Sequence, residues 1–176
     1  MLACEHGYTE ILQILLDKGT DFIKCDKWGQ SPVMKACEHG HIDIVKILLD
    51  RGTDYNKCDG EGQSSVMKAC VNSRTEIVKM LLDRVKHYNK CDKRGQSLLM
   101  KACTYGHIHI VKILLDRGAD LNKCDDQDRS SVMMACENGH TEIVKMLVDN
   151  GTDYNTCDSV NRSPLIKACG SGHTCL

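Results

Sequence analysis

The stretch DKWGQSPVMKACEHGHIDIVKILLDRGTDYNKC, residues 26–58, decides how this chain folds, because the rest of the sequence repeats it. The stretch returns at a spacing of 33 residues in 59–91, 92–124 and 125–157. The back part of the same unit forms residues 1–25, and its front part forms residues 158–176. A fixed period of this length predicts a stacked array of small units, each packed against its neighbours.

Within residues 26–58 the pattern predicts a turn followed by two helices. Ser31 is a suitable cap for the first helix, and Pro32 suits its first position, where a missing N–H costs nothing. The second helix opens at His41 and is apolar on two sides, so it must be buried on two sides, against its partner and the next unit. Gly52 ends this helix, because glycine readily adopts the left-handed conformation found there.

A few positions replace the glycines of the pattern. The turn before the first helix carries Gly29, but its later counterparts include Asp128 and Asn161, two residue types that tolerate the left-handed region. Ser73 and Arg74 stand at the places that Gly40 and His41 occupy in residues 26–58. Residues 85–87 read Val-Lys-His where other units read Gly-Thr-Asp, which predicts a local strain of about 1 kcal/mol.

The elements G-x-S-P-V-M-K-A, G-H-x-x-I-V-x-x-L-L and G-T-D-x-N follow one another in the unit. In these elements the chain resembles the ankyrin repeat, a 33-residue unit with the signature T-P-L-H-x-A. The resemblance extends over residues 1–176. It implies an all-α solenoid of stacked helix-turn-helix units with protruding β-turn or hairpin loops, in a single domain of four complete and two partial repeats. The family's signature histidine is absent, and we expect apolar packing at its places, which hold Met34, Met67, Met100, Met133 and Ile166.

The cysteines follow the repeat. One column is Cys4, Cys37, Cys70, Cys103, Cys136 and Cys169; a second is Cys25, Cys58, Cys91, Cys124 and Cys157; Cys175 is left over. Equivalent residues of stacked helices lie about 8–10 Å apart, whereas a disulfide needs Cα atoms within about 7 Å. We therefore expect reduced thiols, with the first column acting as small apolar residues. Reduced thiols indicate an intracellular, cytoplasmic location, with the nucleus left open.

The sequence offers no pattern for catalysis, a cofactor or a metal ion. Cys4 with His6, and Cys37 with His39, are two residues apart, and on a helix such pairs do not share a face. There is no C-x-x-C pair, H-E-x-x-H, nucleotide-binding loop or partnered nucleophile. We therefore expect a chain that is not an enzyme and takes no cofactor, metal ion or small-molecule substrate.

Charge and hydropathy argue against nucleic acid and membrane as partners. The formal net charge is −1, and no apolar run approaches the roughly 18 residues that span a bilayer. The basic residues near the turns are interrupted by acidic ones, so no single-sign stripe forms. We interpret the repeated lysine of M-K-A-C as part of a solvated helix face; its members are Lys35, Lys68, Lys101 and Lys167.

A few positions vary from unit to unit while the scaffold stays nearly constant. The resemblance places them at turn tips and on the exposed face of the first helices, which line the family's concave groove. We therefore expect a protein partner to bind there; the candidate residues are Trp28, His39, Glu61, Asn72, Arg94, Tyr105, Gln127 and Asn138. Trp, Tyr and Arg are the residue types that anchor interfaces most often, and we expect Trp28, Arg94 and Tyr105, together with His39, to form the binding surface.

The most direct interpretation is a non-catalytic protein–protein interaction scaffold. Two alternatives stay open at this point. The chain can be a passive structural spacer of a larger multi-repeat protein, or the binding part of a protein whose enzymatic domain lies outside it. The partial units at both ends, which lack the polar capping repeats of solenoids, favour the hypothesis that the chain is a fragment of a longer array.

Overall fold

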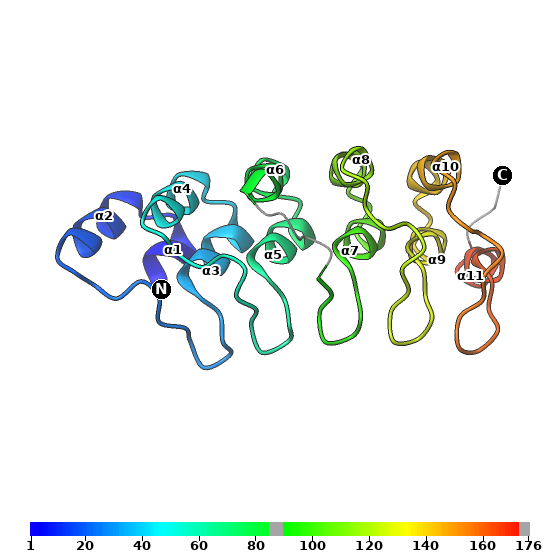
Figure 1. The fold of residues 1–176 in the computed structure, drawn as a ribbon, viewed down its shortest axis with the longest axis horizontal. Coiled ribbons are helices and arrows are strands. Elements are labelled where there is room, and N and C mark those ends of the chain that lie inside the picture. Colours follow the sequence, from blue (N-terminus) through cyan, green and yellow to red (C-terminus); the bar gives the residue numbers. More distant parts are fainter. Residues whose placement is uncertain (85–89, 173–176) are drawn as a thin grey trace. The chain divides into compact units, whose positions relative to one another are not determined.

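The computed structural model describes residues 1–84 and 90–172 (Figure 1). Within these ranges the chain is helical without strands, apart from isolated antiparallel bridges that pair Cys58 with Ser64 and Cys124 with Ser130. The chain divides into two compact units, Met1–Lys86 and His87–Leu176. The strain expected at residues 85–87 and the leftover Cys175 lie outside the described residues.

Each unit is built from consecutive helix pairs. The first unit contains α1 (Leu2–His6) with α2 (Thr9–Asp17), α3 (Pro32–His39) with α4 (Ile42–Asp50), and α5 (Ser65–Val71) with α6 (Thr75–Arg84). The second unit contains α7 (Leu98–Thr104) with α8 (Ile108–Asp116), α9 (Ser131–Glu137) with α10 (Thr141–Asp149), and α11 (Pro164–Gly170). In each unit the first helices of the pairs pack in one row and the second helices in another (Figure 1). This arrangement confirms the all-α repeat fold.

The first helices begin as the sequence predicts. Ser31 caps α3, its Oγ accepting the Met34 backbone N–H at 3.4 Å, and Pro32 occupies the first turn. The Met34 sulfur in turn accepts the Ser31 N–H at 3.5 Å. Ser97 and Met100 repeat this exchange in α7. The Met34 sulfur, a weak hydrogen-bond acceptor, thus takes the role that a Glu or Gln side chain has in the usual capping box.

The expected apolar packing at the signature position is confirmed for four of its five members. These are Met34, Met67, Met100 and Met133, each at most 1% exposed. The expectation is wrong for Ile166 on α11, which is 51% exposed. Among the described residues no further helix pair packs over this side of α11, whereas α11 itself packs over α9.

The second helix α4 is buried on two sides, as predicted, whereas Ile11, Ile14 and Leu15 of α2 are exposed. In α4, Ile44, Val45, Leu48 and Leu49 are all buried. Their partners are α3 in the same pair and the neighbouring second helices α2 and α6. Gly52 follows α4 with a φ of 80°, and its N–H donates to the Leu49 carbonyl at 3.0 Å. A helix of this kind contributes to the core only as one layer of a stack.

An aspartate organises the turn before each first helix from α3 onward; it is buried at Asp59, Asp92, Asp125 and Asp158 and half-buried at Asp26. The Asp59 Oδ1 atom accepts the backbone N–H groups of Glu61 and Gln63, both at 2.9 Å. The Oδ2 atom accepts from the Lys68 ammonium at 2.9 Å. The carboxylate therefore fixes the turn and ties it to α5. The same Oδ1 pattern occurs at Asp26, Asp92, Asp125 and Asp158.

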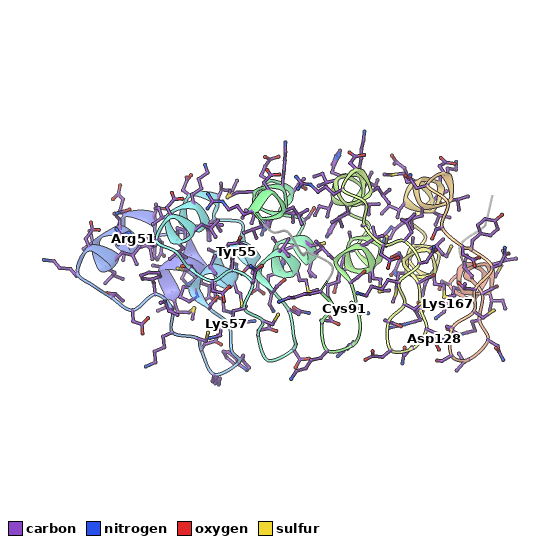
Figure 2. All side chains as sticks on the ribbon, in the orientation of Figure 1. Arg51, Tyr55, Lys57, Cys91, Asp128 and Lys167 are labelled. Atoms are coloured by element: carbon purple, nitrogen blue, oxygen red, sulfur yellow. The ribbon has the colours of Figure 1, made fainter. Side chains whose placement is uncertain are left out.

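The cation that neutralises this aspartate differs from turn to turn. Lys101 approaches Asp92 to 2.6 Å. Before α9, Met134 replaces the lysine, and Arg129 binds Asp125 instead through two nitrogens at 2.9 and 2.7 Å. Before α11, Arg162 and Lys167 both bind Asp158, at 3.0 and 3.3 Å. Figure 2 labels Lys167 on α11. A buried carboxylate needs such a partner, because an unpaired buried charge is costly.

The lysine column is therefore not the solvated helix face expected from the sequence. Lys101 and Lys167 are only 5% exposed, and Lys68 is half-buried. The sequence alone conceals this arrangement because the aspartate lies nine residues earlier in the chain, beyond the reach of helical spacing rules. Lys35 is also half-buried, but its ion pair is with Glu38 at 3.9 Å.

The pKa values of three turn carboxylates, Asp59, Asp125 and Asp158, are lowered. Burial alone would raise the pKa of Asp59, but hydrogen bonds from Lys68 and from the backbone of Gln63 and Glu61 outweigh it and lower the pKa. Asp125 behaves in the same way. At Asp158 the raising effect of burial is overcome by the Arg162 and Val160 amides and by the Arg162 and Lys167 side chains, which bring its pKa to about 2.

Hydrogen bonds also join successive layers within each unit. The His41 ring lies at the start of α4, and its Nε2 is 2.9 Å from the Glu5 carbonyl at the end of α1. His140 makes the same contact with the Thr104 carbonyl at 3.1 Å. Arg74, which replaces this histidine, donates from Nε to the Glu38 carbonyl at 3.2 Å. The prediction that His41 lies at the start of the second helix is confirmed. Its contact with Glu5 also links two successive helix pairs.

The exchange of cations between turns predicts a rescue experiment. Lys101→Met should lower the free energy of unfolding by about 3 kcal/mol, because it leaves the Asp92 carboxylate buried without its ammonium partner. Adding Gln96→Arg reproduces the arrangement seen at Arg129 and Met134, so the double variant should recover most of this loss. Urea unfolding measures both values. A double variant no more stable than Lys101→Met would contradict the interchangeable roles of the two cations.

The lowered pKa values predict a specific loss of stability in acid. A carboxyl whose pKa is lower in the folded state stabilises the fold above its unfolded value of 3.8, and this contribution disappears as the pH falls toward about 2. Asp158→Asn should therefore flatten the fall of Tm between these two pH values. Glu142→Gln on the exposed face of α10 removes one charge away from the turns and serves as the control. Equal slopes in the wild type and Asp158→Asn would contradict the assignment.

Candidate functional site

Neighbouring turn tips are joined through their backbones. The Gly60 N–H donates to the Trp28 carbonyl at 2.9 Å. In the second unit, the Asp126 N–H donates to the Arg94 carbonyl at 3.1 Å, and the Ser159 N–H to the Gln127 carbonyl at 3.0 Å. The scaffold therefore uses only the main chain at these positions. Their side chains are left for other contacts.

The close approach of the tips explains the glycines beside them. Gly29 has a φ of 79°, and a Cβ there would lie 3.1 Å from the Gly60 nitrogen. At Gly95, with a φ of 73°, the corresponding distance to the Asp126 nitrogen is 2.9 Å. Asp128 and Asn161 replace such glycines and keep a positive φ of 58° and 60°, which confirms their predicted left-handed conformation. Asp128 lies at a turn tip (Figure 2).

All eight candidate residues are exposed. Trp28 and Glu61 lie at tips of the first unit, and Arg94 and Gln127 at tips of the second. The other four lie at the ends of first helices: His39 and Asn72 in the first unit, and Tyr105 and Asn138 in the second. Trp28 is 61% exposed and Tyr105 53%, large values for aromatic side chains. Their exposure is compatible with the predicted binding role.

The first unit contains a groove of about 680 Å³ at its turn tips. Trp28 and Glu61 line it from two successive tips, so the structure brings these two candidates together. The Lys27 ammonium lies 4.3 Å from the centre of the Trp28 ring, within the range of a cation–π contact. Three lysines and two carboxylates contribute the charge of the groove; they are Lys27, Lys35, Lys68, Asp59 and Glu61.

The candidates at the helix ends have local partners. The Asn72 and Asn138 amides donate to the Lys68 and Met134 carbonyls, both at 2.9 Å. These two side chains therefore cap the ends of α5 and α9. Tyr105 and His39 instead stack on neighbouring rings, of His107 at 6.0 Å and His41 at 6.2 Å between centroids. These stacked rings remain accessible as flat surfaces.

Lysines 27 and 35 are groove residues that the list of candidates omits. An acidic residue occupies the place of Lys27 in a later unit, and Lys35 belongs to a repeated column, so the charge pattern of the sequence does not single out either lysine. Lys35 differs from the other lysines of its column in the contacts that its side chain makes. Within the described part of the chain, the Asp26 carboxylate accepts the N–H groups of Trp28 and Gln30 and has no cation beside it, so Lys35 lacks the aspartate contact that Lys68, Lys101 and Lys167 make.

The thiols are arranged for packing. Cys4, Cys37, Cys70 and Cys103 are buried, as expected, whereas Cys136 is half-buried and Cys169 is exposed. Burial raises the pKa of the Cys37 thiol far above its ordinary value, which keeps it protonated and unreactive. No disulfide joins the cysteines that the structure describes.

Searches of the described ranges for two other kinds of site give negative results. No group of three or more histidine, cysteine or carboxylate side chains there is arranged to hold a metal ion. None of the helices within residues 1–84 and 90–172 combines the length and apolarity needed to cross a membrane.

A family model described as ankyrin repeats, in three copies, matches residues 1–90 and 85–158. Together the two matches cover most of the chain, including all eight candidate residues. None of the curated proteins compared with the chain matches it.

The packing of the tips predicts unequal costs for two glycine substitutions. Gly118→Ala should cost about 1 kcal/mol, because its φ is 71° but no atom lies within 4 Å of the added Cβ. Gly95→Ala has a similar φ and should cost about 1–3 kcal/mol more, since the Cβ meets the Asp126 backbone. Urea unfolding gives the difference. Equal costs would show that the tips are free to move apart.

Proposed function

Because the chain belongs to the ankyrin repeat family, we propose that it is a non-catalytic scaffold that binds a protein partner through its turn tips and first-helix ends. Ankyrin repeats are in general protein–protein interaction modules, and the family is typically non-catalytic. Repeat scaffolds place variable side chains on a frame whose stability comes from the packed helices.

The observation that carries the proposal is the separation of backbone and side chain at the tips. The frame needs the carbonyl oxygens of Trp28, Arg94 and Gln127 for its hydrogen bonds. It leaves these three side chains exposed, and their identity changes at each tip. Aromatic and arginine side chains that contribute little to the fold are the types that most often dominate binding energy.

The test compares two sets of four substitutions. Replacing Trp28, His39, Arg94 and Tyr105 with alanine should weaken binding to a captured protein partner at least about tenfold. The control replaces four exposed lysines of the second helices with alanine; these are Lys46, Lys79, Lys112 and Lys145. The control should bind the partner as the wild type does. Isothermal titration calorimetry on folded variants gives both affinities.

Two results would contradict the proposal. Unchanged binding by the tip variant would place the partner elsewhere on the chain. Equal loss in the tip and control variants would indicate a general effect on the fold or on net charge. Circular dichroism of each variant separates that general effect from a local one.

A further inference from the structure

One lysine of the groove, Lys35, does not bind the aspartate of its own turn, although the equivalent lysines of other repeats do. Lys68, Lys101 and Lys167 each bind the buried aspartate of their own turn, at 2.9, 2.6 and 3.3 Å. Lys35 occupies the same place in α3, but its ion pair is with Glu38 on the same helix at 3.9 Å. A pair at that distance, one turn apart on the same helix, is weak.

The side chains that line the groove include three lysines and two carboxylates. The Asp59 carboxylate is already bound by Lys68 and two amides. This leaves Lys27 and Lys35 facing the single exposed carboxylate of Glu61. The Lys35 side chain is 17% exposed, so a charge contact there is less screened than one on the open surface.

The Trp28 ring provides an apolar surface in the same groove. It is exposed and lined on one side by Lys27. A groove of about 680 Å³ at two turn tips is open enough to receive an extended segment. The ammonium of Lys35 and the ring of Trp28 together suit a segment with an acidic side chain next to an apolar one.

We propose that this groove, through Lys35, Lys27 and Trp28, binds an acidic peptide segment of the protein partner. The proposal rests on the proposed function and names the chemistry of the partner at this site. A partner carboxylate pairs with the Lys35 ammonium and draws it from Glu38. The neighbouring apolar side chain of the partner covers Trp28.

The chain contains a built-in reporter for this site. Trp28 is its single tryptophan, so the emission of the whole protein reports on this groove. Short random peptides displayed on phage are selected on the intact chain, and enriched sequences are synthesised. Enrichment of Asp or Glu next to an apolar residue is expected. The synthetic peptides should shift Trp28 emission to shorter wavelength, and replacing their Asp or Glu by the amide should abolish the shift.

Matched variants assign the effect to Lys35. Lys35→Gln should weaken peptide binding about fivefold, as expected for the loss of one partly buried ion pair, whereas Lys35→Arg should keep it. Lys46→Gln is the control, because Lys46 forms a similar pair with Asp43 at 3.6 Å on α4, away from the groove. Thermal unfolding confirms that all three variants are folded, and Lys27→Gln provides a second, exposed probe.

The outcomes separate this inference from the function on which it rests. Peptides without acidic residues, no enriched peptide, or binding unaffected by Lys35→Gln and Lys27→Gln would overturn the acidic-segment site. The protein partner captured independently would still lose affinity in the alanine variant of Trp28, His39, Arg94 and Tyr105 if the scaffold function holds. A shift of Trp28 emission by a single-stranded oligonucleotide but by no acidic peptide would assign the groove to nucleic acid and also overturn the proposal.

Discussion

The aspartate in the turn before each first helix from α3 to α11, buried in all but the first of these turns, is the constraint on which the turns depend. One of its oxygens accepts two backbone N–H groups, and at Asp59, Asp92, Asp125 and Asp158 the other oxygen accepts from a lysine or arginine. This double use shapes the turn and fastens it to the following helix. A carboxylate buried in this way must be compensated, because desolvation of an unpaired charge costs more than its local hydrogen bonds return. Because the carboxylate holds the turn in place, it also sets the positions of the turn tips and of their exposed side chains.

The sequence conserves these interactions within the chain even where it changes the residue. Arg129 replaces a glutamine just where Met134 replaces the lysine, so Asp125 keeps a cation from another direction. Arg74 replaces a histidine and still donates to the carbonyl of the preceding first helix. Such replacements look like irregularities when the repeats are aligned. In three dimensions they are alternative solutions to the same electrostatic and hydrogen-bonding requirement.

The helices, their caps and the buried columns could be predicted from the sequence, because they follow from local rules. Ser31, Pro32 and Gly52 act within one helical turn of their partners, and the burial of Ile44 follows from helical periodicity. The role of Lys101 could not be predicted in this way. Its partner Asp92 lies in the preceding turn, and the chain must fold back before the two charges meet. Exposure of the eight candidate residues followed from their variation, whereas the groove beside Trp28 depends on how two turns pack.

Most residues around the groove take part in the hydrogen bonds and ion pairs that hold the turns, but a few side chains do not. At the tips the backbone bonds of Trp28 hold the turn while its ring stays in solvent. Lys35 is free of the turn for a different reason. The Asp26 carboxylate is hydrogen-bonded by backbone amides alone, and the Lys35 ammonium pairs with Glu38 instead. Binding specificity in a repeat array arises at side chains that the fold does not need for its own stability. Only such a side chain can contact a partner without destabilising the fold. By that criterion the turn tips of the first unit are specialised, because Lys35 pairs with Glu38 instead of the turn aspartate and the Trp28 indole is exposed.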